Sequence, residues 1–241
     1  MLTPLRRLIY PAPAWDEDAA PRIHTTKGGA HLIHSPAPEG ARTVVYLHGN
    51  GSDLFSIHPL AALFGAKGLG FAAVEYPGYG PAAGQRISQR AILEAAVEGL
   101  SHLRAQGLTA RRTVLVGESL GSSVAAHLAA DGQLRDGSGE GRLVLVSQFT
   151  SMVAMVQQAV RGFPAVLVPD RWDTQALAGR IDVPTLLVHG EQDEMVPPRM
   201  SASLAGVIPD ARRVTIPGRT HNDLWEPPSG CLQAITDFAT P

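Results

Sequence analysis

From residue 43 onward, short runs of β-branched and aliphatic residues alternate with longer stretches whose apolar residues recur at helical spacing. This alternation is typical of repeated strand–helix units, in which parallel strands form one sheet and the helices cover it. The predicted strands are residues 43–47, 71–75, 113–116, 143–146, 185–188 and 213–216. Each intervening helix carries one apolar stripe that it can bury against the sheet. The pattern therefore predicts an α/β fold, with a mostly parallel central sheet and helices on both faces.

The first forty residues follow a different pattern. Residues 22–34 place Lys27, Gly28 and Gly29 between two extended runs, which predicts a hairpin within about residues 5–36. Because an antiparallel edge on a parallel sheet is common, we expect this hairpin to form an antiparallel N-terminal edge.

No internal repeat or long linker divides the sequence. We therefore expect a single domain over residues 1–241, with a short cap-like insert at about residues 150–183. Residues 136–141 are rich in glycine and lack apolar side chains, so they are expected to form a disordered loop.

Composition narrows the classes of function. The chain has 241 residues, 44% of them hydrophobic, which is enough for a large core. Its formal charge of −2, without a dense basic block, argues against a nucleic-acid partner. The single cysteine, Cys231, rules out an internal disulfide.

No uncharged apolar run is long enough for a spanning helix, and prolines and acids interrupt the N-terminal stretch that a signal peptide would need. We expect a cytoplasmic chain with no membrane span and a small-molecule partner; composition leaves the oligomeric state open.

Residues 117–121 read GESLG and connect a predicted buried strand to a predicted helix. In open α/β sheets, ligands bind beyond the carboxyl ends of the strands, so residues at the other strand ends decide whether Ser119 is reactive. Asp193 and His221 each lie just beyond a later strand. The order Ser, Asp, His at successive strand ends is that of a nucleophile elbow with its catalytic triad.

The residue types fit this chemistry. A serine hydroxyl becomes nucleophilic when a neighbouring histidine takes its proton, and the histidine later returns that proton to the leaving group. His221 is the predicted base, and Asp193 is predicted to hold its tautomer and stabilise the imidazolium. Glu191 and Glu194 are the alternatives for the acid. A different interpretation remains open, in which Ser119 is a helix N-cap with glycine neighbours.

Two backbone amides are needed to stabilise the oxyanion. We expect one from Leu120, at the start of the helix, and the other from Asn50 in the loop after the first parallel strand, with Gly51 as the alternative. Met152 and Met155 recur at helical spacing beside the expected cleft. They are either core residues or the wall of an acyl pocket.

No cofactor or metal is expected. His24, His31 and His34 lie on the predicted hairpin and lack the spacing of metal ligands on a helix. Glu118 lies inside the predicted elbow, where it either perturbs the nucleophile or points into supporting structure.

Six stretches resemble those of a known family. They are LHGNGSD (47–53), EYPGYG (75–80), GESLGSSVAAHLA (117–129), SQFTSM (147–152), LLVHGEQDEMVP (186–197) and THND (220–223). Together they resemble the α/β-hydrolase superfamily, in a branch of lid-poor serine hydrolases that includes serine aminopeptidase-like domains and membrane-tethered depalmitoylases. The resemblance covers about residues 42–240. It implies the α/β-hydrolase fold, a triad of Ser119, Asp193 and His221, and oxyanion donors at Asn50 and Leu120.

Two departures narrow what the resemblance implies. Members of this branch often carry an N-terminal membrane anchor or a cysteine cluster, and this sequence shows neither, so membrane depalmitoylation is not implied. The short insert implies an open, shallow cleft. The predicted function is a serine hydrolase that cleaves a carboxylic ester or thioester through an acyl-enzyme. A peptidase or amidase uses the same attack step, and a non-catalytic binder on this scaffold is a further alternative, although its usual mark, a damaged triad, is missing.

Overall fold

The computed structural model describes residues 6, 9–15 and 22–240. Its main sheet contains β1 (His24–Thr25), β2 (His31–Ser35), β3 (Thr43–Leu47), β4 (Gly70–Val74), β5 (Thr113–Glu118), β8 (Arg142–Val146), β9 (Thr185–Gly190) and β10 (Ala211–Ile216). The strand order is β1-β2-β4-β3-β5-β8-β9-β10, and every neighbouring pair from β4 to β10 is parallel. The predicted mostly parallel sheet is therefore confirmed.

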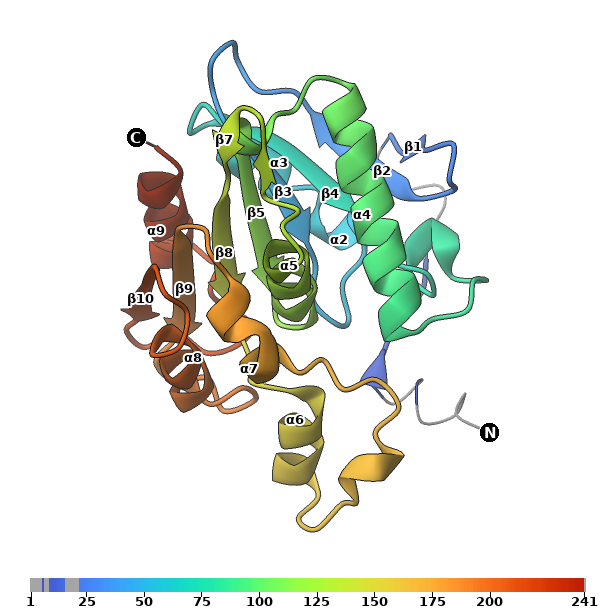
Figure 1. Ribbon diagram of the computed structural model, residues 1–241, viewed down its shortest axis with the longest axis vertical. Coiled ribbons are helices and arrows are strands. Elements are labelled where there is room, and N and C mark those ends of the chain that lie inside the picture. Colours follow the sequence, from blue (N-terminus) through green and yellow to red (C-terminus); the bar gives the residue numbers. More distant parts are fainter. Residues whose placement is uncertain (1–5, 7–8, 16–21, 241) are drawn as a thin grey trace.

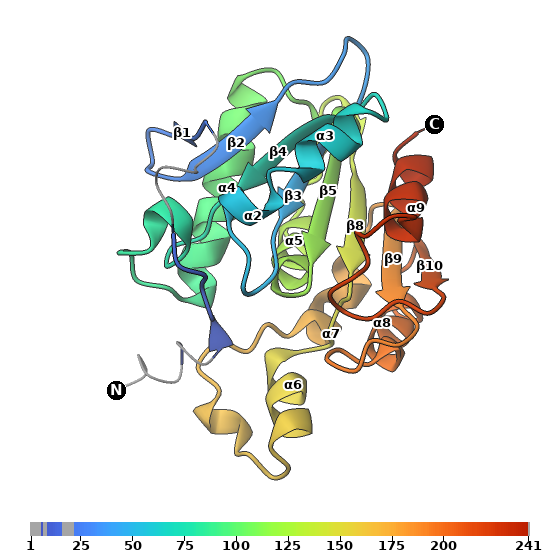
Figure 2. The same cartoon turned by 180° about the vertical axis from the view of Figure 1, so that it is seen from behind.

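Helices cover both faces of this sheet. They are α2 (Leu54–Ile57), α3 (Leu60–Gly65), α4 (Gln89–Ala105), α5 (Leu120–Ala130), α6 (Met152–Ala159), α7 (Thr174–Leu177), α8 (Pro198–Ala205) and α9 (Gly230–Ala239). Single 3-10 turns occur at Gly80–Ala82, Ala110–Arg112, Ala165–Leu167 and Ala178–Arg180. Figures 1 and 2 show α4 and α5 on one face of the sheet and α2, α3 and α9 on the other.

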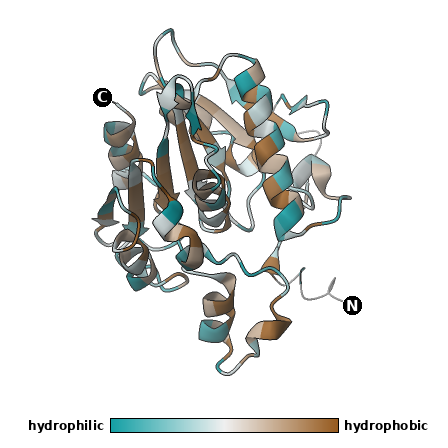
Figure 3. Ribbon diagram, viewed as in Figure 1, coloured by the Kyte–Doolittle hydropathy of each residue, from teal (hydrophilic) through white to brown (hydrophobic). Residues whose placement is uncertain are grey.

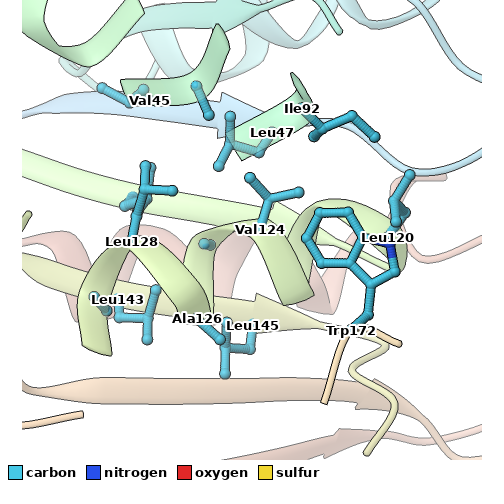
Figure 4. Close-up of a cluster of buried hydrophobic side chains, with 14 of the residues drawn as sticks. Val45, Leu47, Ile92, Leu120, Val124, Ala126, Leu128, Leu143, Leu145 and Trp172 are labelled. Carbon is cyan, nitrogen blue, oxygen red and sulfur yellow. The ribbon is translucent and has the colours of Figure 1, made fainter. Parts of the chain in front are cut away.

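The two faces bury two separate apolar clusters, because side chains alternate along each strand. In β3, Val45 and Leu47 belong to the cluster under α4 and α5, whereas Val44 and Tyr46 belong to the cluster under α3 and α9. Figure 4 shows the first cluster, in which Val124 of α5 lies among side chains of the strands. Figure 3 shows hydrophobic residues along the central strands and a mixture of both kinds along α4, as expected for a helix with one buried stripe.

The N-terminal edge is antiparallel, as predicted. Strand β1 pairs with β2, and β2 pairs with β4, both antiparallel. The remainder of the predicted hairpin at residues 5, 7–8 and 16–21 lies outside the described residues.

The prediction of a disordered loop at residues 136–141 is wrong. Strands β6 (Arg135–Asp136) and β7 (Gly139–Glu140) form a small antiparallel hairpin there. The Asp136 carboxylate orders it by accepting hydrogen bonds from the backbone N–H groups of Ser138 and Ala110, both at 2.7 Å. Polar contacts therefore order a segment that lacks apolar side chains.

The insert at residues 150–183 extends beyond the carboxyl ends of the strands, at the bottom of Figure 1. Helix α6 and the segment that follows it protrude, but Trp172 is fully buried beneath α5. The Trp172 indole donates to the Tyr10 hydroxyl at 2.8 Å, and the Arg6 guanidinium pairs with Asp170 at 2.9 Å. The return of the insert is thus tied to the N-terminal segment. None of the helices described here has the length and apolar character needed to cross a membrane.

The turn from β5 into α5 leaves no space for side chains at its two glycines. A Cβ on Gly117 would lie 2.1 Å from the Gly121 carbonyl oxygen, and a Cβ on Gly121 would lie 1.9 Å from the Leu47 carbonyl oxygen. The turn is anchored to the neighbouring strand, because the Ser119 N–H donates to the Val146 carbonyl at 2.9 Å. Both glycines are therefore required by close approach of backbone to backbone.

Replacing Gly121 with alanine is expected to lower the free energy of unfolding by about 3 kcal/mol or more, because an added methyl group would force β3 and α5 apart. The matched control is Gly65→Ala in α3, where a Cβ would meet nothing within 4 Å. That variant should match the parent or gain up to about 1 kcal/mol. Urea unfolding followed by circular dichroism measures both. A Gly121→Ala protein as stable as the parent would contradict the close approach.

Candidate active site

Ser119 occupies the turn between β5 and α5 in a conformation that few residues other than glycine adopt. Its φ is 50° and its ψ is −111°. It stands at the N-cap position of α5, yet its side chain makes no capping hydrogen bond. The interpretation of Ser119 as a capping serine is therefore not supported. A strained backbone that leaves the hydroxyl unused for capping is typical of a functional position.

Ser119 and His221 line the same cavity, which has a volume of about 250 Å³. We call it the inner cavity; Asn50, Glu118, Tyr46 and Trp225 also line it. His221 in addition lines a larger cavity of about 600 Å³, the outer cavity, together with Glu194 and Met195. The His221 ring therefore stands between two spaces, only one of which is lined by Ser119.

His221 is held by Asp193. The His221 Nδ1 atom lies 2.8 Å from the Asp193 Oδ2 atom, and the Asp193 side chain is fully buried. Burial by itself raises the pKa of this carboxyl, but hydrogen bonds from His189, His221 and the Val196 N–H outweigh it and hold the pKa well below its ordinary value. Asp193 is therefore ionised at neutral pH and accepts the Nδ1 proton of His221, which fixes the ring in one tautomer.

The sequence reasoning did not identify His189 as a second histidine on this carboxylate. Its side chain is fully buried at the end of β9, and its Nε2 atom lies 2.7 Å from the Val196 carbonyl and 3.2 Å from Asp193 Oδ2. Its Nδ1 atom has no partner among the described residues, so both oxygens that the ring meets lie at Nε2, which donates to them. The HGEQD stretch carries this residue, but only the fold shows that it faces the acid.

The two predicted oxyanion donors both have free amides. Neither the Asn50 N–H nor the Leu120 N–H donates to another atom of the described residues. The alternative donor, Gly51, is already engaged, because its N–H donates to the Pro11 carbonyl at 2.8 Å. Gly49 approaches the elbow so closely that a Cβ there would lie 3.3 Å from the Cβ of Ser119. The loop thus brings Gly49 against the elbow, and Asn50 lines the same cavity as Ser119.

A buried hydrogen bond between His48 and Glu75 supports this loop. His48 Nε2 lies 2.7 Å from Glu75 Oε1, and both side chains are fully buried. His48 Nδ1 donates to the Gly49 carbonyl at 2.9 Å, so both ring nitrogens face oxygen acceptors. Glu75 also accepts the N–H groups of Leu54 and Tyr76, at 3.1 and 3.0 Å. One carboxylate therefore joins the ends of β3 and β4 to the start of α2. The sequence reasoning missed this pair, although both residues lie in the quoted motifs LHGNGSD and EYPGYG.

The Asn50 side chain is held as well. Its amide nitrogen donates to the Ile9 carbonyl at 2.7 Å, and its carbonyl oxygen accepts the Tyr79 hydroxyl at 2.7 Å. Together with the bond from Gly51 to Pro11, these contacts tie residues 9–11 to the loop of residues 48–51. The prediction of an N-terminal hairpin gave no indication of this role.

The alternative acids lie elsewhere. Glu191 accepts the Gly218 N–H at 3.0 Å, and Glu194 is exposed at the outer cavity. Neither makes a hydrogen bond to His221, whose Nδ1 partner is Asp193.

Met152 and Met155 do not line the inner cavity. Met152 is buried in the core cluster under α5, and Met155 packs against that cluster. The hypothesis that they form an acyl pocket is not supported, because α6 turns this apolar stripe toward the protein core.

Comparison with known proteins identifies the family of the fold. A family model described as alpha/beta hydrolase fold matches residues 169–228. The uncharacterized protein Rv2307c of Mycobacterium tuberculosis (strain ATCC 25618 / H37Rv) is 30% identical over 200 residues, covering 81% of this chain and 68% of the relative. Protein bem46 of Schizosaccharomyces pombe is 28% identical over 215 residues, covering 86% of this chain and 70% of the relative.

Among solved structures, the proline iminopeptidase of Mycobacterium smegmatis superposes with a TM-score of 0.70 at 16% sequence identity, covering 90% of this chain and 97% of the other. At that identity the similarity concerns the fold alone. The match to Rv2307c, by contrast, extends over most of both sequences. The sheet order, the elbow and these matches agree, and the chain belongs to the α/β-hydrolase family.

Proposed function

We propose that the protein is a serine hydrolase that cleaves carboxylic esters or thioesters through an acyl-enzyme. The observation that carries the proposal is the shared inner cavity, in which the uncapped Ser119 hydroxyl faces the same space as a histidine bonded to a buried carboxylate. A serine, a base and an orienting acid in this relation are the parts that acyl transfer requires.

In the first half of the reaction, Ser119 Oγ attacks the substrate carbonyl carbon while His221 Nε2 takes the hydroxyl proton. Asp193 stabilises the resulting imidazolium through the bond at Nδ1. The negative charge that develops on the carbonyl oxygen is placed between the free amides of Asn50 and Leu120. Each such donor contributes about 2.7–4 kcal/mol of transition-state stabilisation.

The tetrahedral intermediate then collapses. His221 returns its proton to the leaving alcohol or thiol, and the acyl group stays on Ser119. In the second half, a water takes the place of the leaving group, gives a proton to His221 and attacks the acyl carbon, which releases the acid and restores the Ser119 hydroxyl.

The two cavities suggest how the substrate lies. Because the carbonyl oxygen must point at the loop of Gly49 and Asn50, the acyl group falls into the inner cavity that this loop lines. The leaving group must reach the proton of His221, which also borders the outer cavity. Hydrolysis of an amide would use the same steps, and the proline iminopeptidase with this fold is a precedent for that alternative.

A fluorophosphonate probe is expected to label the protein once, at Ser119, because His221 activates that hydroxyl. Ser119→Ala should abolish labelling, and Ser122→Ala, one turn later in α5, should retain it. Intact mass spectrometry and peptide mapping measure both. Undiminished labelling of the Ser119→Ala protein would mean that the elbow assignment is wrong.

Asp193→Asn is expected to lower kcat on the order of 10⁴-fold with the fold retained, since an amide favours the wrong imidazole tautomer. Glu191→Gln and Glu194→Gln are the matched controls, and both should stay within a few-fold of the parent because neither carboxylate bonds His221. Turnover of p-nitrophenyl acetate, with circular dichroism to check folding, decides the case. Greater damage from either control would reassign the acid.

A small acyl cavity predicts a preference for short chains. The inner cavity has a volume of about 250 Å³, so kcat/KM for p-nitrophenyl esters should stop rising once the acyl chain is too long for it. Each methylene that is buried contributes roughly 0.8 kcal/mol, and methylenes that remain in water contribute none of this. The measurement is kcat/KM from acetate to palmitate. A steady rise beyond about eight carbons would reveal a deep acyl tunnel.

A further inference from the structure

The inner cavity is lined by an acidic side chain but, among the described residues, by no Lys or Arg. The acidic side chain is that of Glu118, which contributes a carboxylate. The other buried acid of the site, Asp193, lies behind His221 and does not line this cavity. The acyl side of the site therefore has one carboxylate without a cationic partner in its wall.

One oxygen of Glu118 is held and the other is free. The Tyr46 hydroxyl donates to Glu118 Oε2. Burial, together with the neighbouring Glu118 charge, raises the pKa of the Tyr46 phenol well above its ordinary value, so this hydroxyl remains a donor. Glu118 Oε1 accepts no hydrogen bond from the part of the chain that the structure describes. The carboxylate is thus fixed in position and keeps an acceptor for a ligand.

The position of the Glu118 carboxylate is fixed from the protein side. The Tyr46 ring is fully buried and packs edge to face on Trp225 at a centroid distance of 5.9 Å, so the hydroxyl that holds Glu118 Oε2 cannot move away. An acyl group with a second carboxylate would meet Glu118 at close range with no cation to offset the repulsion.

Resting on the proposed hydrolase function, we propose that the inner cavity selects short acyl groups that carry a cationic amine, and that Glu118 binds this amine. The substrate class is then esters or thioesters of small amino acids. The acyl carbonyl lies between the Asn50 and Leu120 amides, and the ammonium group donates to Glu118 Oε1. Neutral acyl groups of the same length fit the space but gain no ion pair.

The test compares three p-nitrophenyl esters of similar length: β-alanine, butanoate and hemisuccinate. Each kcat/KM is divided by the rate of hydroxide-catalysed hydrolysis of the same ester, which removes differences in intrinsic reactivity. The parent protein should prefer the β-alanine ester to butanoate by on the order of tenfold and should disfavour the hemisuccinate, as expected when one partly buried ion pair is gained or a like-charge contact is made. Equal rates for the β-alanine and butanoate esters would overturn the inference and leave the serine hydrolase proposal intact.

Two variants assign the preference to a residue. Glu118→Gln keeps an acceptor for the Tyr46 hydroxyl but removes the charge, so the ratio of β-alanine to butanoate rates should fall toward one. Glu194→Gln removes a carboxylate from the outer cavity and should keep the ratio of the parent. A ratio that survives Glu118→Gln would overturn the role of Glu118.

Should Glu118→Gln not fold, the order of the three esters with the parent protein still decides the charge preference. If no ester is hydrolysed and no fluorophosphonate label appears, the proposed function itself fails, and the inference fails with it.

Discussion

The close approach of β3, β5 and α5 is the constraint on which the rest of the site depends. Helix α5 begins one residue after the elbow serine, and it begins there only because Gly117 and Gly121 let three backbone segments meet without side chains between them. The same packing forces Ser119 to a φ of 50°. The cost of such a conformation, of order 1–3 kcal/mol, is offset by the large apolar cluster beneath α5. A serine in this position has a hydroxyl directed away from the helix that it starts, which makes it available for chemistry.

Around this turn, the loops of the site are held by polar contacts between segments that are far apart in the sequence. Glu75 and His48 form a fully buried hydrogen bond beside the loop of residues 48–51, and residues 9–11 bond to Asn50 and Gly51 of the same loop. Asp193 accepts from two histidines, one near the end of β9 and one in the loop after β10. Groups that stabilise a transition state must be fixed before the reaction to be effective, and these contacts fix the residues to which we assign those roles.

The sequence predicted the parts of this structure that have a strong local signal. Short β-branched and aliphatic runs located all six parallel strands, because they alternate with stretches of helical spacing. The residue types after those strands were enough to predict Ser119, Asp193 and His221, which the structure brings to one edge of the sheet. The fold is thus confirmed, whereas the catalytic roles of these residues are still predictions.

The features that could not be predicted depend on how helices and side chains are oriented in the fold, which the spacing of residues in the sequence does not determine. Met152 and Met155 have the right period for a pocket wall, but the direction in which α6 leaves β8 turns them into the core. His189 and Glu75 are single polar residues at strand ends, and only the register of neighbouring strands shows what they face. Likewise, the hairpin at residues 135–140 depends on a side-chain contact between Asp136 and Ala110, which lie 26 residues apart.

In the mechanism that we propose, Ser119 attacks a carbonyl whose oxygen lies between the Asn50 and Leu120 amides. A crystal structure of the protein after reaction with a small fluorophosphonate tests this most directly, because the phosphonyl group on serine has the shape and charge distribution of the tetrahedral intermediate. We expect phosphorus bonded to Ser119 Oγ, with the phosphonyl oxygen about 2.7–3.1 Å from both amide nitrogens. An adduct on another residue, or a phosphonyl oxygen that points away from both amides, would contradict it.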